Sequence, residues 1–167
     1  DFFLAALLGA DARFSDDVNI VSWNYDSQIE LAYSHYIKTN KLSDCAARLN
    51  LGLRDSKEIK VSYEGFNLLK VNGSTSIYDD LKQRSFYFLD NVKYASPEEM
   101  WGQSLFFYSA LRRRRQINLS SLAFAWEGQE SESPYYDNVS STFLDTEILV
   151  IIGYSFPFFN RVIDRAI

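Results

Sequence analysis

Short apolar runs alternate along the chain with segments whose apolar residues recur at helical spacing. Residues 19–23 and 67–71 are rich in β-favouring residues and each run ends in polar positions, which predicts strands. Residues 147–152 are almost continuously apolar, a pattern typical of a buried strand in a parallel sheet. Helices are expected at residues 2–14, 27–33, 43–49, from 96 to about 112–115, at 136–144 and at 158–167.

Local signals define where several of these helices begin and end. Ser27 and Ser43 are expected N-caps, and Gly52 is expected to follow the end of the helix that Ser43 begins. Pro97 is suited to a first helical position, with Ser96 before it and two glutamates after it. Residues 118–127 fit neither pattern, and 128–134 read as a polar loop. Strands alternating with helices predict one α/β domain over residues 1–167, with a mainly parallel sheet and helices on both faces.

Composition narrows the class of protein. The 167 residues suit one domain, and 47% hydrophobic residues supply a core. A net charge of −5 argues against a nucleic-acid binder, which needs a basic face. Cys45 is the single cysteine, so the chain holds neither an internal disulfide nor a cysteine-rich metal site, and we expect no bound metal. No apolar run approaches the roughly 20 residues that cross a bilayer, and we expect a cytoplasmic protein.

Small or polar residues follow each of the three expected strands. In open α/β sheets, ligands bind beyond the carboxyl ends of the strands, and glycine lets the backbone approach a ligand closely. Each segment taken alone is also explained as an ordinary turn. The three together favour a shared ligand site, formed by Asn24, Tyr25 and Asp26, by Asn72, Gly73 and Ser74, and by Gly153, Tyr154 and Ser155.

These segments resemble three motifs of the sirtuin-like (silent-information-regulator-type) NAD-binding family. The first resembles its Asn-x-Asp segment, and the second its motif ending in His-Gly. The third is similar to the bacterial Gly-Tyr-Ser variant of its Gly-Thr-Ser motif, found in sirtuin-like domains of which many are NAD-cleaving defence proteins. The matching segments are Ser22-Trp23-Asn24-Tyr25-Asp26, Leu69-Lys70-Val71-Asn72-Gly73-Ser74 and Leu149-Val150-Ile151-Ile152-Gly153-Tyr154-Ser155-Phe156-Pro157.

The resemblance implies a Rossmann-like sheet and a site for NAD or ADP-ribose. Asn24 would face the nicotinamide ribose, and Gly153 with Ser155 would face the adenosine side. Asp26, Gly73 and Tyr154 would line the same NAD site. Asn72 stands at the position of the catalytic histidine, so Asn24 and Asn72 are the two candidates for catalysis.

The sequence departs from the family in three respects. Asn72 is not a base at neutral pH, whereas histidine is suited to that role. The glycine-rich loop that cradles the pyrophosphate is not found; residues 9–15 only imitate it, and we expect the loop upstream of Asp1 in a longer protein. A four-cysteine zinc ribbon, usual in the deacylases, cannot be formed, so deacylation is not expected.

Three interpretations remain open. The first is an NAD-binding domain, with NAD glycohydrolase activity, in a bacterial defence or signalling protein that has further domains and forms homo-oligomers. The second is a non-catalytic nucleotide-sensing or scaffold domain with a degenerate site. The third is an unrelated structural α/β domain. Other residues are read as structural, namely His35 as a helix residue, Cys45 as a buried thiol, residues 112–115 as a solvated helix end, and Trp23, Trp101 and Trp126 as core.

Overall fold

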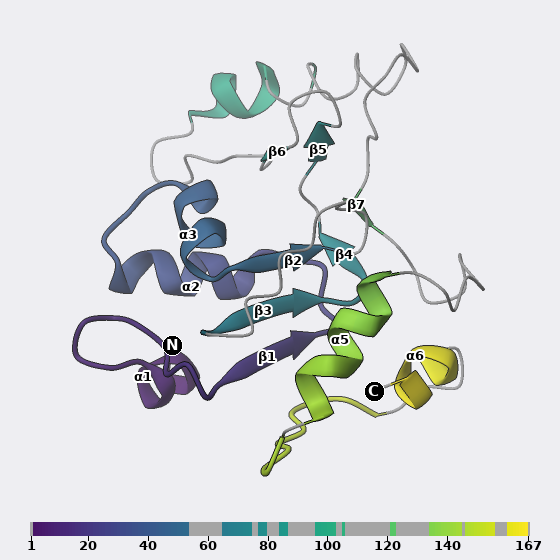
Figure 1. Ribbon diagram of the computed structural model, residues 1–167. Helices are drawn as coiled ribbons and strands as arrows, with labels where there is room; N and C mark the ends of the chain where they lie inside the picture. The colour runs from purple at the N-terminus through teal and green to yellow at the C-terminus, as the bar shows by residue number, and fades with distance from the viewer. Residues whose placement is uncertain are drawn as a thin grey trace.

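A three-stranded parallel sheet organises the domain. The computed structural model describes residues 2–53, 65–74, 77–79, 84–86, 96–102, 105, 121–122, 134–144, 146–155 and 160–166. The strand order is β1 (Asn19–Ser22), β3 (Asn67–Lys70) and β2 (Leu51–Leu53), as Figure 1 shows. Every residue of the central strand β3 is buried, whereas β1 at the edge is partly exposed. The prediction of an α/β domain with a parallel sheet is confirmed for this part of the chain.

The register brings the carboxyl ends of all three strands to one edge of the sheet. Lys70, the last residue of β3, pairs with Ser22 on one side and with Leu53 on the other. Two helices, α2 (Gln28–Tyr36) and α3 (Leu42–Arg48), connect β1 to β2. Because β1 ends at the carboxyl edge, the loop that follows it lies there. The two helices then return the chain to the amino edge, where β2 begins.

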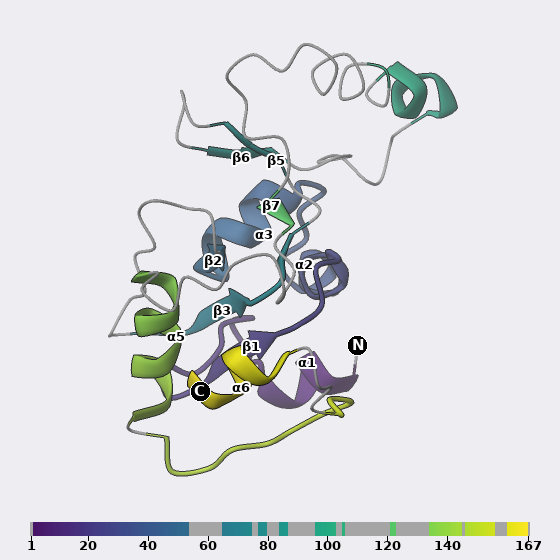
Figure 2. The same ribbon diagram turned by 90° about the vertical axis from the view of Figure 1, so that its right-hand side faces the viewer.

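The main core lies between β3 and the helices that precede it. Seven buried residues form it: Leu4, Phe14, Tyr33, Cys45, Leu49, Phe66 and Leu68. The rings of Phe14 and Phe66 stack with their centroids 4.0 Å apart. The Tyr33 hydroxyl donates to the carbonyl of Ala12 at 2.9 Å, which ties α2 to the loop before β1. In Figure 2, α2 and α5 (Pro134–Leu144) lie on opposite sides of β1 and β3.

The first helix is shorter than its apolar pattern predicts. Helix α1 spans Phe2–Leu7, and the chain then turns instead of continuing to residue 14. The amide of Gly9 donates to the carbonyl of Arg13 at 2.8 Å, and the Asp11 carboxylate accepts from the Arg13 amide at 3.3 Å. Ala12 adopts a left-handed φ of 58°. The glycine-loop imitation at residues 9–15 is therefore a tight turn.

The predicted buried strand at residues 147–152 is wrong. These residues have no strand partner within the described part of the chain, and the side chains of Ile148 to Ile152 are 51% to 81% exposed. An apolar run supplies the side chains of a buried strand, but a strand forms only where a neighbouring edge accepts its backbone hydrogen bonds. The described sheet provides no such pairing for this run.

One helix end is found where the sequence predicted it, and two others differ from the prediction. Ser96 and Glu99 form a reciprocal capping box, with the amide of each residue bonded to the side chain of the other at 2.9 and 3.2 Å. Residues 97–102 are helical, whereas residues 112–115 lie outside the described residues. Ser43 does not cap α3, which begins at Leu42. Gly52 lies within β2, and Asn50, with a φ of 44°, follows the end of α3 instead.

The remaining described elements are small. β4 (Gly73–Ser74) pairs antiparallel with β7 (Ser121–Leu122), inside the stretch that fitted neither pattern. β5 (Ile77–Asp79) pairs antiparallel with β6 (Arg84–Phe86). Helix α6 covers Arg161–Ala166. Among the helices of the described residues, none is long and apolar enough to span a membrane.

Candidate functional site

The two candidate asparagines lie at the same edge of the sheet. Asn24 follows β1 and Asn72 follows β3, and these strands are parallel neighbours. The ladder continues past the strands, because the amide of Val71 donates to the carbonyl of Ser22 at 2.9 Å. The side-chain amide of Asn72 then donates to the carbonyl of Trp23 at 2.8 Å. The sequence expectation that these two segments meet is confirmed.

Tyr154 reaches this edge although no strand leads to it. Its ring stacks on the ring of Trp23, with centroids 4.3 Å apart and planes inclined by 28°. Its hydroxyl donates to the Asp164 carboxylate at 2.7 Å and accepts from the Asn160 side-chain amide at 2.8 Å. Ring stacking and side-chain hydrogen bonds therefore hold the Gly153 segment here in place of strand pairing. Trp23 is the residue on which all three candidate segments converge.

The environment of the Tyr154 hydroxyl favours its neutral form. Burial and the hydrogen bond to the Asp164 carboxylate raise the pKa of Tyr154 to about 12, above its usual value of 10.0. The phenol therefore stays protonated, and keeps donating to Asp164, across the physiological range.

Replacing Tyr154 with phenylalanine should reveal this raised pKa as a pH-dependent loss of stability. We expect the variant to lose about 1–2 kcal/mol of unfolding free energy at pH 7–9, because Asp164 and the buried Asn160 lose their partner. Because the pKa of Tyr154 is raised in the folded state, its contribution to the free energy of unfolding is fully present below pH 10.0, the unfolded pKa. This contribution disappears as the pH rises through about 12. Urea unfolding of both proteins at pH 8, 10 and 11 measures the difference. A difference that stays constant over this range would contradict the assignment.

The loop between β1 and α2 is ordered by its own side chains. The Ser22 hydroxyl accepts from the amide of Asn24 at 3.2 Å, and an Asp26 carboxylate oxygen accepts from the amide of Gln28 at 3.1 Å. Ser27 occupies the N-cap position of α2, but its side chain makes no capping bond. Asp26 supplies that bond instead, so its carboxylate serves the helix end. Asn24 remains exposed at the edge.

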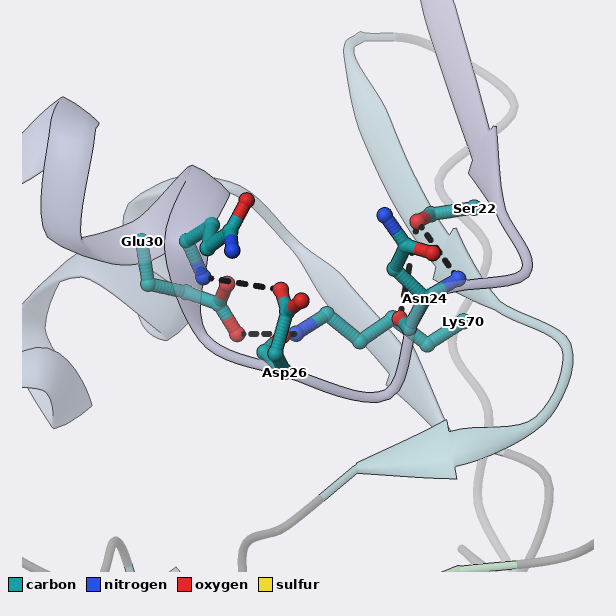
Figure 3. A network of polar contacts seen from close by, with 6 residues as sticks. Ser22, Asn24, Asp26, Glu30 and Lys70 are labelled. Carbon is teal, nitrogen blue, oxygen red and sulfur yellow. Dashed lines mark hydrogen bonds and ion pairs between the residues drawn. The ribbon is translucent and has the colours of Figure 1, made fainter. Parts of the chain in front are cut away.

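A buried ion pair lies beneath this loop, and sequence reasoning missed it. The Lys70 ammonium lies 2.7 Å from a Glu30 carboxylate oxygen, and the side chains are 1% and 0% exposed. The same ammonium donates to the backbone carbonyl of Asp26, as Figure 3 shows. The available signal was weak: a lysine between apolar Leu69 and Val71, and an acid in the first turn of α2, the helix that follows β1.

The glycines and serines of the candidate motifs differ in accessibility. Gly73 and Gly153 both adopt left-handed backbone conformations, with φ of 73° and 66°. Gly73 and Ser74 are buried, and they contribute to β4. Gly153 and Ser155 are exposed beside the edge. Of these four, Gly153 and Ser155 are therefore the ones that can approach a ligand from solvent.

The edge presents neutral hydrogen-bonding groups rather than an acid–base pair. Within the described residues, three buried side-chain atoms have no hydrogen-bond partner: the Asn72 side-chain oxygen, the Trp23 indole nitrogen and the Oε2 of Glu30, whose Oε1 pairs with Lys70. Amide and indole groups can orient hydroxyl groups of a sugar but cannot take up a proton at neutral pH. No cluster of three or more metal-ligating side chains is found among the described residues.

Residues interpreted as structural have mixed outcomes. Cys45 is fully buried in the core, as expected. His35 is exposed on α2, and Trp23 is partly buried at the edge rather than central to the core. Trp101 is 67% exposed, so its assignment to the core is wrong: its helix has no buried face within the described residues. Trp126 lies outside the described residues.

Comparison with known proteins gives no relative for this chain. Neither the protein-family models, nor the curated sequences, nor the solved structures contain a significant match.

Proposed function

We propose that this chain is a sirtuin-like NAD-binding domain of Rossmann-like type, which binds NAD or ADP-ribose at the carboxyl edge of its parallel sheet. The observation that carries the proposal is the convergence on Trp23. Asn24 follows it, Asn72 donates to its carbonyl, and Tyr154 stacks on its ring. Three motifs that resemble one family are separated by up to 130 residues of chain (154 − 24) and still meet at one point.

The chemistry of the edge suits the sugar parts of a dinucleotide. Asn24 is exposed and carries both a donor and an acceptor, so it can hold ribose hydroxyl groups without adding charge. Exposed Ser155 can donate to a second ribose or to a phosphate. Parallel α/β sheets bind such ligands at the carboxyl edge, where these residues lie.

A non-catalytic sensing role is the second candidate, and one contact favours it. The Asn72 amide is committed to the Trp23 carbonyl, so it holds the loop after β1 in place. A side chain used in this way, and unable to accept a proton, fits a site that binds a nucleotide without cleaving it. We accordingly propose that the chain cleaves NAD slowly or not at all. In a larger cytoplasmic defence or signalling protein, such binding would regulate attached domains.

Nuclear magnetic resonance titration tests the binding proposal directly. We expect NAD and ADP-ribose to shift the indole N–H signal of Trp23, while the exposed Trp101 serves as an internal control. Asn24→Ala should weaken binding about tenfold, the loss of roughly one hydrogen bond. Asn40→Ala is the matched control, because Asn40 is exposed and lies beyond the far end of α2. Absence of any shift at millimolar NAD and ADP-ribose would exclude the proposal.

A further inference from the structure

The ion pair between Lys70 and Glu30 is placed where it can control the site. Its two residues come from β3, the strand that pairs with β1, and from α2, the helix that follows the β1–α2 loop. Both side chains are buried, at 1% and 0% exposure, with the ammonium 2.7 Å from the carboxylate. Burial of two charges carries a large desolvation cost, which well-packed apolar residues in the same place would avoid. Stability alone is therefore weak grounds for the presence of this pair.

The second partner of the ammonium, after Glu30, indicates what the pair does. Lys70 also donates to the backbone carbonyl of Asp26, within the loop that carries Asn24. Glu30 accepts from the same ammonium, so a lysine side chain that moved out of this position would leave a buried carboxylate unpaired. Figure 3 shows the lysine side chain extending from β3 beneath the loop toward α2.

We propose that Lys70 and Glu30 are positioning residues, which lock the loop of residues 23–27 and so place Asn24 for ligand binding. This inference rests on the proposed nucleotide site for its ligand, but the lock itself is a property of the loop. Asp26 connects the loop to both β3 and α2, because its carbonyl accepts from Lys70 while its carboxylate accepts from the Gln28 amide at the start of α2. The loop is thereby attached to the sheet and to the helix at one residue.

The decisive experiment replaces the pair with apolar residues of similar size. Lys70→Met combined with Glu30→Leu leaves the net charge unchanged and removes the ammonium from the Asp26 carbonyl. The melting temperature should stay close to that of the wild type. Backbone order parameters of residues 23–27, measured by nitrogen-15 relaxation, should fall from about 0.85 to below about 0.6. Affinity for NAD should fall about tenfold, since only part of the loop ensemble then presents Asn24 correctly.

An exposed ion pair supplies the matched control. Arg13 and Asp11 lie 3.5 Å apart with side chains 84% and 65% exposed, in the loop before β1. Arg13→Met with Asp11→Leu makes the same chemical change in the segment between α1 and β1. Loop order and NAD affinity should both remain at wild-type values.

Each result decides the proposal. A folded double variant that keeps an ordered loop and wild-type affinity would refute the lock. If that variant does not fold, the wild-type protein decides alone: order parameters below about 0.6 at residues 23–27 would refute the lock, and values near 0.85 would support it. If the wild type fails to bind NAD while loop order responds as expected, the lock stands and the proposed function fails.

Discussion

Replacing Lys70 alone with methionine is expected to lower the free energy of unfolding by about 3–5 kcal/mol. The reason is that Glu30, fully buried, would keep its carboxylate without a cation. The carbonyl of Asp26 would also lose its donor. Urea unfolding followed by circular dichroism gives the difference. Because small domains have total stabilities of about 5–15 kcal/mol, this single change is expected to remove a large fraction of the stability.

Two further variants separate the effect of an unpaired buried charge from the effect of losing an ion pair in general. Adding Glu30→Leu to the Lys70→Met variant should restore most of the stability, since removing both charges leaves no unpaired group in the interior. Arg13→Met, which breaks the exposed pair with Asp11, should cost less than about 1 kcal/mol. If Lys70→Met costs no more than Arg13→Met, the pair cannot be buried as described.

The pairing of β1 with β3 could be predicted because both segments carry a strand pattern in the sequence. Residues 19–23 and 67–71 each combine β-favouring residues with a polar end, and both form strands of the parallel sheet. Their polar ends meet because parallel neighbours share a carboxyl edge. The sequence therefore predicted that Asn24 and Asn72 share one edge of the sheet.

Residues 147–152 show why hydrophobicity alone is insufficient. The run has the composition of a buried strand, yet Ile148 and Val150 are largely exposed. Strand pairing depends on a free sheet edge close to the segment, and the composition of the segment does not indicate whether such an edge exists. Tyr154 still reaches the predicted site, because its ring stacks on Trp23 and its hydroxyl bonds to Asp164 of α6 and to Asn160.

The buried ion pair could not be predicted for a different reason. Lys70 and Glu30 are 40 residues apart (70 − 30), and each is ordinary in its local context. A lysine near the end of a strand is normally solvated, and a glutamate in the first turn of a helix is normally explained by the helix dipole. Only the packing of α2 against the sheet brings the two charges together and excludes water.

Asn72→His tests whether the site is a degenerate enzyme, and we expect NAD cleavage to rise by about 10²–10⁴-fold. One ring nitrogen of the histidine can donate to the Trp23 carbonyl, which Asn72 binds at 2.8 Å. That bond leaves the second nitrogen free to accept a proton near neutral pH. The rate of cleavage is measured by liquid chromatography of the nicotinamide that is released.

Asn72→Gln is the matched control, because it keeps an amide at the position and adds no base, so cleavage should stay at the wild-type level. Binding is measured for all three proteins by the Trp23 indole shift. A histidine variant that binds NAD like the wild type but does not cleave it would exclude the degenerate enzyme and leave the sensing role. Rapid cleavage by the wild type would instead contradict the proposal that the chain cleaves NAD slowly or not at all.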